Sequence, residues 1–385
     1  MVDSKPSASF DFNPMDAYAV ARFRMSLDVD GEQIKALKPH LVSRAFLEHL
    51  KLHKKTSLLA GSDLTLAENH YKPFRAEKLQ TYRHIMVFRA GGIGDLIFTY
   101  PALAAIKRLN PECRITYVTH RDHHSLLKAF EPNPVDALAG IPMPFEFFQS
   151  ADAHLFLEKV IEYHPLAQSL DAYALFHRHV FQETDAQPLR LPTFACDANL
   201  LDQLRPQIPE RLVLIHPRAN SPFRTVHKQV WLDLVPALVE RGYAVGFLDS
   251  PKMADKLDAF LAGQFPSLEG LYNLARLSTS LAHTLALCAL ADYAIGVDSS
   301  IINLFAATGK PCIGLYTCFP GALRLGPFPN ATVIQTSYNG CGAMPCFHHV
   351  DGTFACVDVA KGGTPGCVAG FEKDRILEAV ATKFK

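Results

Sequence analysis

The order of apolar and polar residues changes character near residue 83. From His84 onward, short apolar runs alternate with segments in which apolar residues recur every three or four positions. Runs of four or five apolar residues are typical of buried parallel strands, and the longer spacing is typical of helices packed on a sheet. The alternation therefore predicts an α/β protein built on parallel sheets.

The predicted elements form two series separated by a less regular, proline-punctuated stretch from Glu146 to Pro209 that contains one helix, 166–180. In the first series, strands are expected at 85–88, 114–118 and 137–141, and helices at 95–109 and 125–130. In the second, strands are expected at 212–215, 244–248, 293–297 and 311–316, and helices at 229–241, 278–290, 300–308 and 372–385. We predict two Rossmann-like domains, 83–205 and 206–385, that face a central cleft where ligands bind at the carboxyl ends of the strands.

Residues 1–82 precede both series and carry no recognisable chemistry. Leu37, Leu41, Phe46 and Leu50 recur at near-helical spacing, which predicts a helix over 32–58 in a mainly helical N-terminal extension. Its aromatic and charged residues suit docking against the body of the protein or against another subunit of a homo-oligomer.

Composition narrows the choice of partners. The chain has 385 residues, 49% of them hydrophobic, which suffices for more than one core. Lys plus Arg and Asp plus Glu number 38 each, so no global positive field attracts a polyanion and a nucleic acid is not expected as a partner.

The sequence predicts a cytoplasmic protein. No window approaches the roughly 20 uninterrupted apolar residues of a membrane-spanning helix, and the polar start lacks the pattern of a signal peptide. The Phe- and His-rich stretch 145–181 is either part of a core or a peripheral contact with the inner membrane face.

Glycines and one carboxylate follow the first predicted strand, in the loop Arg89-Ala-Gly-Gly-Ile-Gly-Asp95. Gly92 and Gly94 let backbone amides approach an anion closely. Their spacing is not that of the dinucleotide fingerprint. Asp95 has two interpretations, a charge favoured by the helix dipole or a general base that takes a proton from an attacking hydroxyl.

Three separate stretches resemble glycosyltransferase family 9, the ADP-heptose heptosyltransferases. The loop ending at Asp95 continues into Thr99-Tyr-Pro-Ala-Leu, similar to the opening signature of the family. The stretch 290–311 resembles its Ala-Asp strand, Asp-Thr-Gly turn and Gly-x-Pro close. The stretch 215–231 resembles the strand and turn that open the family's nucleotide-binding domain, with Arg224 where the family has a phosphate-contacting Lys.

This resemblance, over about 84–385, implies a GT-B fold and an inverting transfer without a catalytic metal. Asp95 would then deprotonate the acceptor hydroxyl, and Arg224 would stabilise the leaving nucleotide. The residues expected to bind the nucleotide-sugar donor are Gly92, Gly94, His216, Arg218, Lys228, Asp298, Ser299, Ser300 and Asn303. For Arg224 and Lys228 the alternative is a solvated helix start, and for Asp298 and the two serines an ordinary helix cap.

Two departures from the family leave the donor sugar open. Ser299-Ser300 stands where the family has Thr-Gly, and Asn303 where it has a helical His. ADP-heptose is the favoured donor, and the acceptor is a glycan such as lipopolysaccharide core or a protein hydroxyl. The rival functions are a non-catalytic sugar-nucleotide binding protein and a Rossmann oxidoreductase. The oxidoreductase should have an acidic residue where this chain has Thr119-His120.

Four of the nine cysteines, Cys341, Cys346, Cys356 and Cys367, crowd into one Gly-rich stretch. In a cytosolic protein such a cluster is more typical of a metal site than of disulfides, and unligated thiols are the other alternative. A branch of the resembled family that glycosylates autotransporter proteins has an iron site built from such cysteines. A structural iron or zinc is therefore expected here. The remaining five cysteines read as buried small hydrophobes.

Overall fold

Two parallel sheets carry most of the apolar runs seen in the sequence. The structure, a computed structural model, describes residues 40–42, 64–66, 72–89, 91–140, 145–158, 160–182, 188–340, 356–360 and 363–384. The chain divides into two compact units. The first consists of Met1–Gly91, Leu109–Arg121 and Val135–Lys159, and the second of Gly92–Arg108, Asp122–Pro134 and Val160–Lys385.

The first unit holds a parallel sheet of strand order β5-β4-β3-β6. Its strands are β3 (His84–Phe88), β4 (Arg114–Val118), β5 (Ala137–Ala139) and β6 (Ala153–Phe156). Ile85, Met86 and Val87 have no exposed surface, as expected of a strand covered on both faces. This order, 3-2-1-4 in the sequence of the strands, is that of a Rossmann half, with its switch point between β3 and β6.

A buried ion pair joins the carboxyl ends of β3 and its neighbour, the edge strand β6. The Arg89 guanidinium, directly after β3, lies 3.1 Å from the Glu158 carboxylate and donates to the Leu157 carbonyl at 3.0 Å, both directly after β6. Because Arg89 is only 1% exposed, this pair fixes the start of the Gly-rich loop.

Strand order in the second unit is β12-β11-β10-β7-β8-β9, again fully parallel. Its strands are β7 (Leu212–His216), β8 (Ala244–Phe247), β9 (Leu271–Asn273), β10 (Tyr293–Val297), β11 (Cys312–Tyr316) and β12 (Ala331–Gln335). Numbered within the unit, this is the six-stranded Rossmann order 3-2-1-4-5-6. The switch point lies between β7 and β10.

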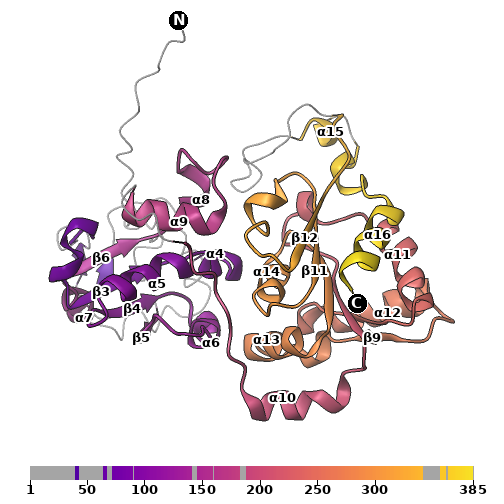
Figure 1. The fold of residues 1–385 in the computed structure, drawn as a ribbon, viewed down its shortest axis with the longest axis horizontal. Coiled ribbons are helices and arrows are strands. Elements are labelled where there is room, and N and C mark those ends of the chain that lie inside the picture. The colour runs from indigo at the N-terminus through magenta and orange to yellow at the C-terminus, as the bar shows by residue number, and fades with distance from the viewer. Residues whose placement is uncertain are drawn as a thin grey trace, which may run out of the picture. The chain divides into compact units, whose positions relative to one another are not determined.

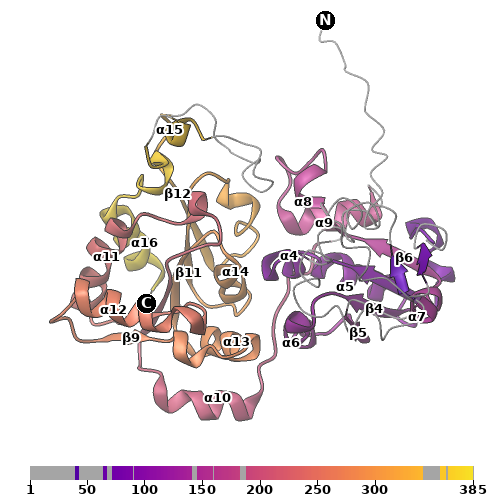
Figure 2. The same cartoon turned by 180° about the vertical axis from the view of Figure 1, so that it is seen from behind.

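Helices cover both faces of the second sheet (Figure 1). α11 (Lys228–Glu240) and α16 (Lys373–Lys383) pack on one face, and α13 (Leu281–Leu290) and α14 (Ser300–Ala306) on the other, which Figure 2 shows from behind. Trp231, the single tryptophan, lies 3% exposed on α11 in a core with Ile295, Ile313 and Ile376. Burial of these side chains is the main force that holds helices and sheet together.

Nine further α-helices occur in the described chain. They are α4 (Ile93–Phe98), α5 (Tyr100–Leu109), α6 (His124–Lys128), α7 (Phe145–Gln149), α8 (Val160–Tyr163), α9 (Ala172–Phe181), α10 (Ala198–Leu204), α12 (Ala254–Gln264) and α15 (Val357–Ala360). α9 begins later than the sequence predicted because the Asp171 side chain caps it, accepting from the Ala174 amide at 2.9 Å.

The prediction of a helix over 32–58 is wrong at residues 40–42. His40–Val42 form strand β1, which pairs in parallel with β2 (Leu64–Leu66). Pro39 precedes β1, and a proline in a helix interior removes a donor and clashes with the preceding turn. The rest of that predicted helix lies outside the described residues.

Most aromatic residues of 145–181 whose burial is described belong to cores, while Phe147 and His164 are half-buried and His179 is exposed. Phe148, Phe156, Phe176 and Phe181 are at most 4% exposed. Their burial favours the core interpretation of this stretch. Within the described ranges, no helix combines the length and the apolar character that a membrane crossing requires.

Candidate active site

The switch point of the second unit opens into a cavity of about 720 Å³. His216 ends β7, and Asp298 follows β10 directly, so both lie at carboxyl ends of neighbouring strands. This is the position at which open parallel sheets bind ligands. All lining residues belong to the second unit: Gly92, Ile93, Gly94, Asp95, Phe98, His123, Ile161, His216, Arg218, Ala219, Asn220, Ser221, Pro222, Phe223, Arg224, Asp249, Asp298, Ser299, Ser300, Asn303, Phe319 and Arg324.

The cavity brings together ten of the eleven residues that the sequence assigned to catalysis and donor binding. The exception is Lys228, which lines a neighbouring cavity of about 300 Å³ with mostly apolar walls, formed in part by Trp231 and Phe260. Arg218 and Asp249 line both cavities.

Asp95 occupies the first turn of α4, where its side chain caps the start of the helix. Its Oδ2 accepts the Gly92 N–H at 2.9 Å. Gly94, on the same turn, lies against Ser300 of α14. The half-buried carboxylate is thus fixed in orientation while it lines the cavity.

Arg224 ends a short 3₁₀ helix, Pro222–Arg224, and points at the strand end of β10. Its Nη1 donates to the Asp298 carbonyl at 3.4 Å and lies 3.9 Å from the Asp298 carboxylate. Its Nε is buried and has no hydrogen-bond partner among the described residues. The guanidinium therefore keeps donor capacity that this part of the chain does not use.

His216 is held as a neutral acceptor. Burial lowers its pKa, and its Nδ1 lies 2.8 Å from the Leu248 carbonyl, to which only a protonated Nδ1 can donate. The other ring nitrogen is then free of a proton. Beside it, Arg218 forms two 2.9 Å contacts with the same Asp249 carboxylate oxygen, through Nε and Nη2.

Polar atoms without partners gather after β10. The Ser299 Oγ and the Asn303 Oδ1 are buried and have no hydrogen-bond partner within the ranges that the structure describes, although the Asn303 amide donates to the Ser299 carbonyl at 3.0 Å. Buried polar groups in native proteins are nearly always satisfied, so such a group beside a cavity indicates a bound ligand.

Sequence reasoning missed Arg324, Phe319 and Asp249 among the lining residues. Asp249 follows β8, and its place at a strand end could have revealed it. Arg324 and Phe319 come from the turn between β11 and β12, and an isolated cation among apolar residues was the one available signal.

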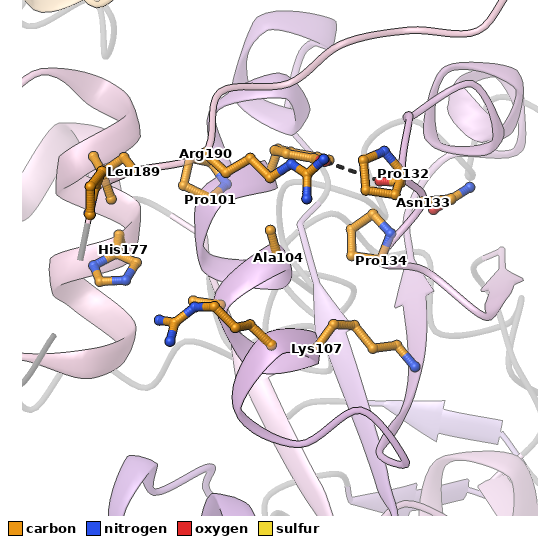
Figure 3. Close-up of a pocket in the computed structure, with 13 residues that line it drawn as sticks. Pro101, Ala104, Lys107, Pro132, Asn133, Pro134, His177, Leu189 and Arg190 are labelled. Carbon is orange, nitrogen blue, oxygen red and sulfur yellow. Dashed lines mark hydrogen bonds between the residues drawn. The ribbon is translucent and has the colours of Figure 1, made fainter.

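A third cavity, of about 340 Å³, lies along α5 (Figure 3). Lys107, Arg108 and Arg190 line it, and no carboxylate occurs among its described lining residues. Arg190 extends over Ala104 toward Pro132, whose carbonyl accepts from the Tyr100 hydroxyl at 3.0 Å. The proline-rich walls and the basic rim of this cavity suit an anionic ligand that also has an apolar surface.

The predicted metal site is only partly described. Cys341 and Cys346 lie outside the described residues, while Cys356 is half-buried and Cys367 is 7% exposed. Cys367 packs with Cys318 and Val368. No group of three or more metal-ligating side chains occurs in the described part of the chain. Of the scattered cysteines, Cys196 is half-buried, and Cys113, Cys288, Cys312 and Cys318 are buried.

The comparison with protein families decides the assignment. The model of glycosyltransferase family 9 (heptosyltransferase) matches residues 157–353, slightly more than half of the chain. The chain belongs to glycosyltransferase family 9. It is accordingly a glycosyltransferase, which excludes the oxidoreductase. The comparison with curated proteins gives no match.

Solved structures of the family share its fold. ADP-heptose lipopolysaccharide heptosyltransferase II of E. coli is 15% identical, with a TM-score of 0.57 over 78% of this chain and 98% of that one. A family 9 glycosyltransferase of Veillonella parvula is 13% identical, with a TM-score of 0.56 over 78% and 97%. The iron-containing dodecameric glycosyltransferase TibC of enterotoxigenic E. coli is 15% identical, with a TM-score of 0.55 over 82% and 77%. The predicted GT-B fold class is confirmed.

Proposed function

We propose that this glycosyltransferase moves a heptose-type sugar from a nucleoside diphosphate sugar, with ADP-heptose favoured, to a hydroxyl of a glycan such as lipopolysaccharide core. The observation that carries the proposal is the single cavity lined by a carboxylate, Asp95, and a cation with unused donors, Arg224. Family membership supplies the reaction class. The solved E. coli relative acts on ADP-heptose and lipopolysaccharide.

The proposed step is an inverting displacement without a catalytic metal. The acceptor hydroxyl gives its proton to the Asp95 carboxylate, and its oxygen forms a bond to the anomeric carbon. The bond from that carbon to the diphosphate oxygen breaks, and its electron pair stays on the phosphate. The Arg224 guanidinium lies where it would donate to this developing charge.

An anionic glycan is the acceptor that the cavity along α5 supports. Phe98 lines the active-site cavity and Tyr100 lines the cavity along α5, so residues at the junction of α4 and α5 contribute to the walls of both. Lys107, Arg108 and Arg190 would bind the acceptor's acidic groups there.

A protein hydroxyl is the second candidate acceptor. It is favoured by the structural similarity to iron-containing, dodecameric TibC and by the four cysteines at 341–367, which would hold a structural iron or zinc. The same relative suggests a homo-oligomer of this chain.

A panel of nucleoside diphosphate sugars, incubated with and without glycan and protein acceptors, tests the proposal. We expect ADP release from ADP-heptose that rises with an acidic glycan acceptor and is lost in Asp95→Asn. Release from other donors alone would contradict the heptose assignment, and undiminished release in Asp95→Asn would contradict the base.

A further inference from the structure

Arg324 is a buried cation in the wall of the active-site cavity. It follows the 3₁₀ helix Gly321–Leu323 in the turn between β11 and β12 (Figure 1) and is 8% exposed. Its guanidinium carbon lies 3.9 Å from the centre of the Phe319 ring and 5.5 Å from that of Phe98. The stacking fixes the plane of the guanidinium.

The turn that carries Arg324 is held rigidly. Gln335 of β12 accepts the Gly321 N–H at 3.0 Å and donates to the carbonyls of Thr317 and Phe319 at 2.7 and 3.2 Å. Gly321 has no room for a Cβ against Tyr316. The guanidinium is therefore preorganised before any ligand arrives.

In the described part of the chain, Arg324 has no carboxylate in direct contact with its guanidinium. Among the described residues, no hydrogen bond or ion pair satisfies the guanidinium, and its Nη1 is buried with no partner. Burial lowers its pKa, while the charges of Asp298 and Asp95 act in the opposite direction. The neighbouring Tyr316 and Tyr173 carry no charge, because burial raises the pKa of both phenols well above the usual value.

A buried charge without hydrogen bonds destabilises a ligand-free protein, so its presence in a cavity wall indicates an anionic ligand. Asp298 interacts electrostatically with both Arg324 and Arg224. The two guanidinium groups thus act on the same end of the cavity. A pair of fixed cations matches the two charged groups of a diphosphate.

We propose that Arg324 binds the diphosphate of the donor and, as the anomeric carbon–oxygen bond breaks, stabilises the charge left on the phosphate oxygen. This assignment rests on the proposed function. Arg324 would share the leaving group with Arg224, and the hydroxyl proton would go to Asp95 as before.

Three variants test the assignment: Arg324→Met, Arg324→Ala and, as a control, Arg375→Met. Arg375 is an exposed arginine of α16 that donates to the Gln335 carbonyl. For each we would measure the melting temperature without ligand, the affinity for ADP and for inorganic pyrophosphate, and turnover.

We expect Arg324→Met to melt at the same or a higher temperature than wild type without ligand. Its affinity for ADP and pyrophosphate should fall at least about tenfold and its turnover about 10²- to 10³-fold. Millimolar guanidinium should restore part of the turnover of Arg324→Ala, and Arg375→Met should behave as wild type. A structural arginine would give no such rescue.

A lower melting temperature with unchanged ADP and pyrophosphate affinity in Arg324→Met would overturn the assignment and leave the proposed function intact. Absence of any ADP or pyrophosphate binding in wild type would instead overturn the proposed function and, with it, this assignment.

Discussion

The Gly92 amide donates to Oδ2 of Asp95 at 2.9 Å, so one carboxylate both caps α4 and faces the cavity. Loss of activity on replacing Asp95 could follow from loss of the helix cap or from loss of the proposed base. The two effects can be told apart only with a variant that removes one and keeps the other. Asparagine separates them, because its carbonyl oxygen can accept the Gly92 N–H while its amide cannot take a proton from an acceptor.

Asp95→Asn should therefore keep the melting temperature of wild type and lose about 10²- to 10⁴-fold in turnover. Asp95→Ala should lose as much turnover and, in addition, about 1 kcal/mol of stability with the cap. Nucleotide release and thermal unfolding measure the two effects. An Asn variant that turns over at a tenth of the wild-type rate or better would leave Asp95 with the cap alone.

Arg224 and Lys228 stand four residues apart, and the structure separates them. Arg224 lies beside Asp298 in the cavity, whereas Lys228 lines the apolar neighbour. Arg224→Ala should reduce turnover about 10²- to 10³-fold, and Lys228→Ala less than about threefold. Steady-state kinetics with the donor varied compares them. Equal losses in the two variants would contradict the distinction.

The basic cavity along α5 should act on the acceptor alone. Removing Lys107 and Arg190 together, as Lys107→Ala/Arg190→Ala, should raise KM for an acidic glycan acceptor about tenfold or more. Slow donor hydrolysis without an acceptor should not change. An effect on hydrolysis equal to that on transfer would mean that these cations do not recognise the acceptor.

His154 makes the first unit sensitive to acid. Its ring stacks on Phe148, Nδ1 accepts the Lys72 N–H at 3.0 Å, and Nε2–H donates to the Phe148 carbonyl at 2.9 Å. Burial lowers its pKa from 6.5 to about 4. As the pH falls, the histidine is therefore protonated in the unfolded chain before it is protonated in the folded one. We expect the free energy of unfolding to decrease by about 3 kcal/mol in all as the pH falls from 6.5 to 4.

Hydrogen exchange of the β3 and β6 amides at pH 7.5 and 5, corrected for the intrinsic rate, follows this loss. The loss of protection at pH 5 should be smaller in His154→Gln than in wild type. It should be unchanged in His227→Gln, because His227 is an exposed residue of the second unit. A loss of equal size in both variants would assign the acid sensitivity to other groups.

Removing divalent metal should leave transfer intact. After treatment with EDTA and desalting, nucleotide release should continue at the untreated rate, since the proposed step uses Asp95 and arginines. Restoration of a lost activity by Mg²⁺ or Mn²⁺ would contradict this. Iron and zinc analysis of wild type, Cys356→Ser and Cys367→Ser tests the structural site separately, and we expect bound metal in the wild type alone.

Most of the strands that the sequence predicted are buried on both faces, and the half-buried edge strand β5 is the exception. β3 and β7 read as unbroken apolar runs because helices or loops cover each side. β9 and β12 lie at the edges, are only partly buried, and show no such run. β6 was missed because His154 interrupts its apolar pattern, although a buried hydrogen-bonded histidine packs there.

The site followed the same logic. Asp95 was noticed because it stands where an apolar run meets a helix start, and His216 and Asp298 were chosen because they lie in stretches that resemble the motifs of the family. Arg324 was not, because its significance depends on Phe98 and Phe319, the first of them more than two hundred residues away in the chain. The role inferred for Arg324 depends on its burial, and the burial of a turn residue cannot be predicted from the local sequence.

Trp231 gives the second unit an optical reporter of its own. The side chain is 3% exposed against the second sheet, and it also lines the apolar cavity that shares Arg218 and Asp249 with the active site. Since the chain has no other tryptophan, its fluorescence will follow denaturation of this sheet and will not register the first unit. A change in emission on adding a nucleotide can likewise be attributed to the surroundings of Trp231 on the second sheet, without labelling the protein.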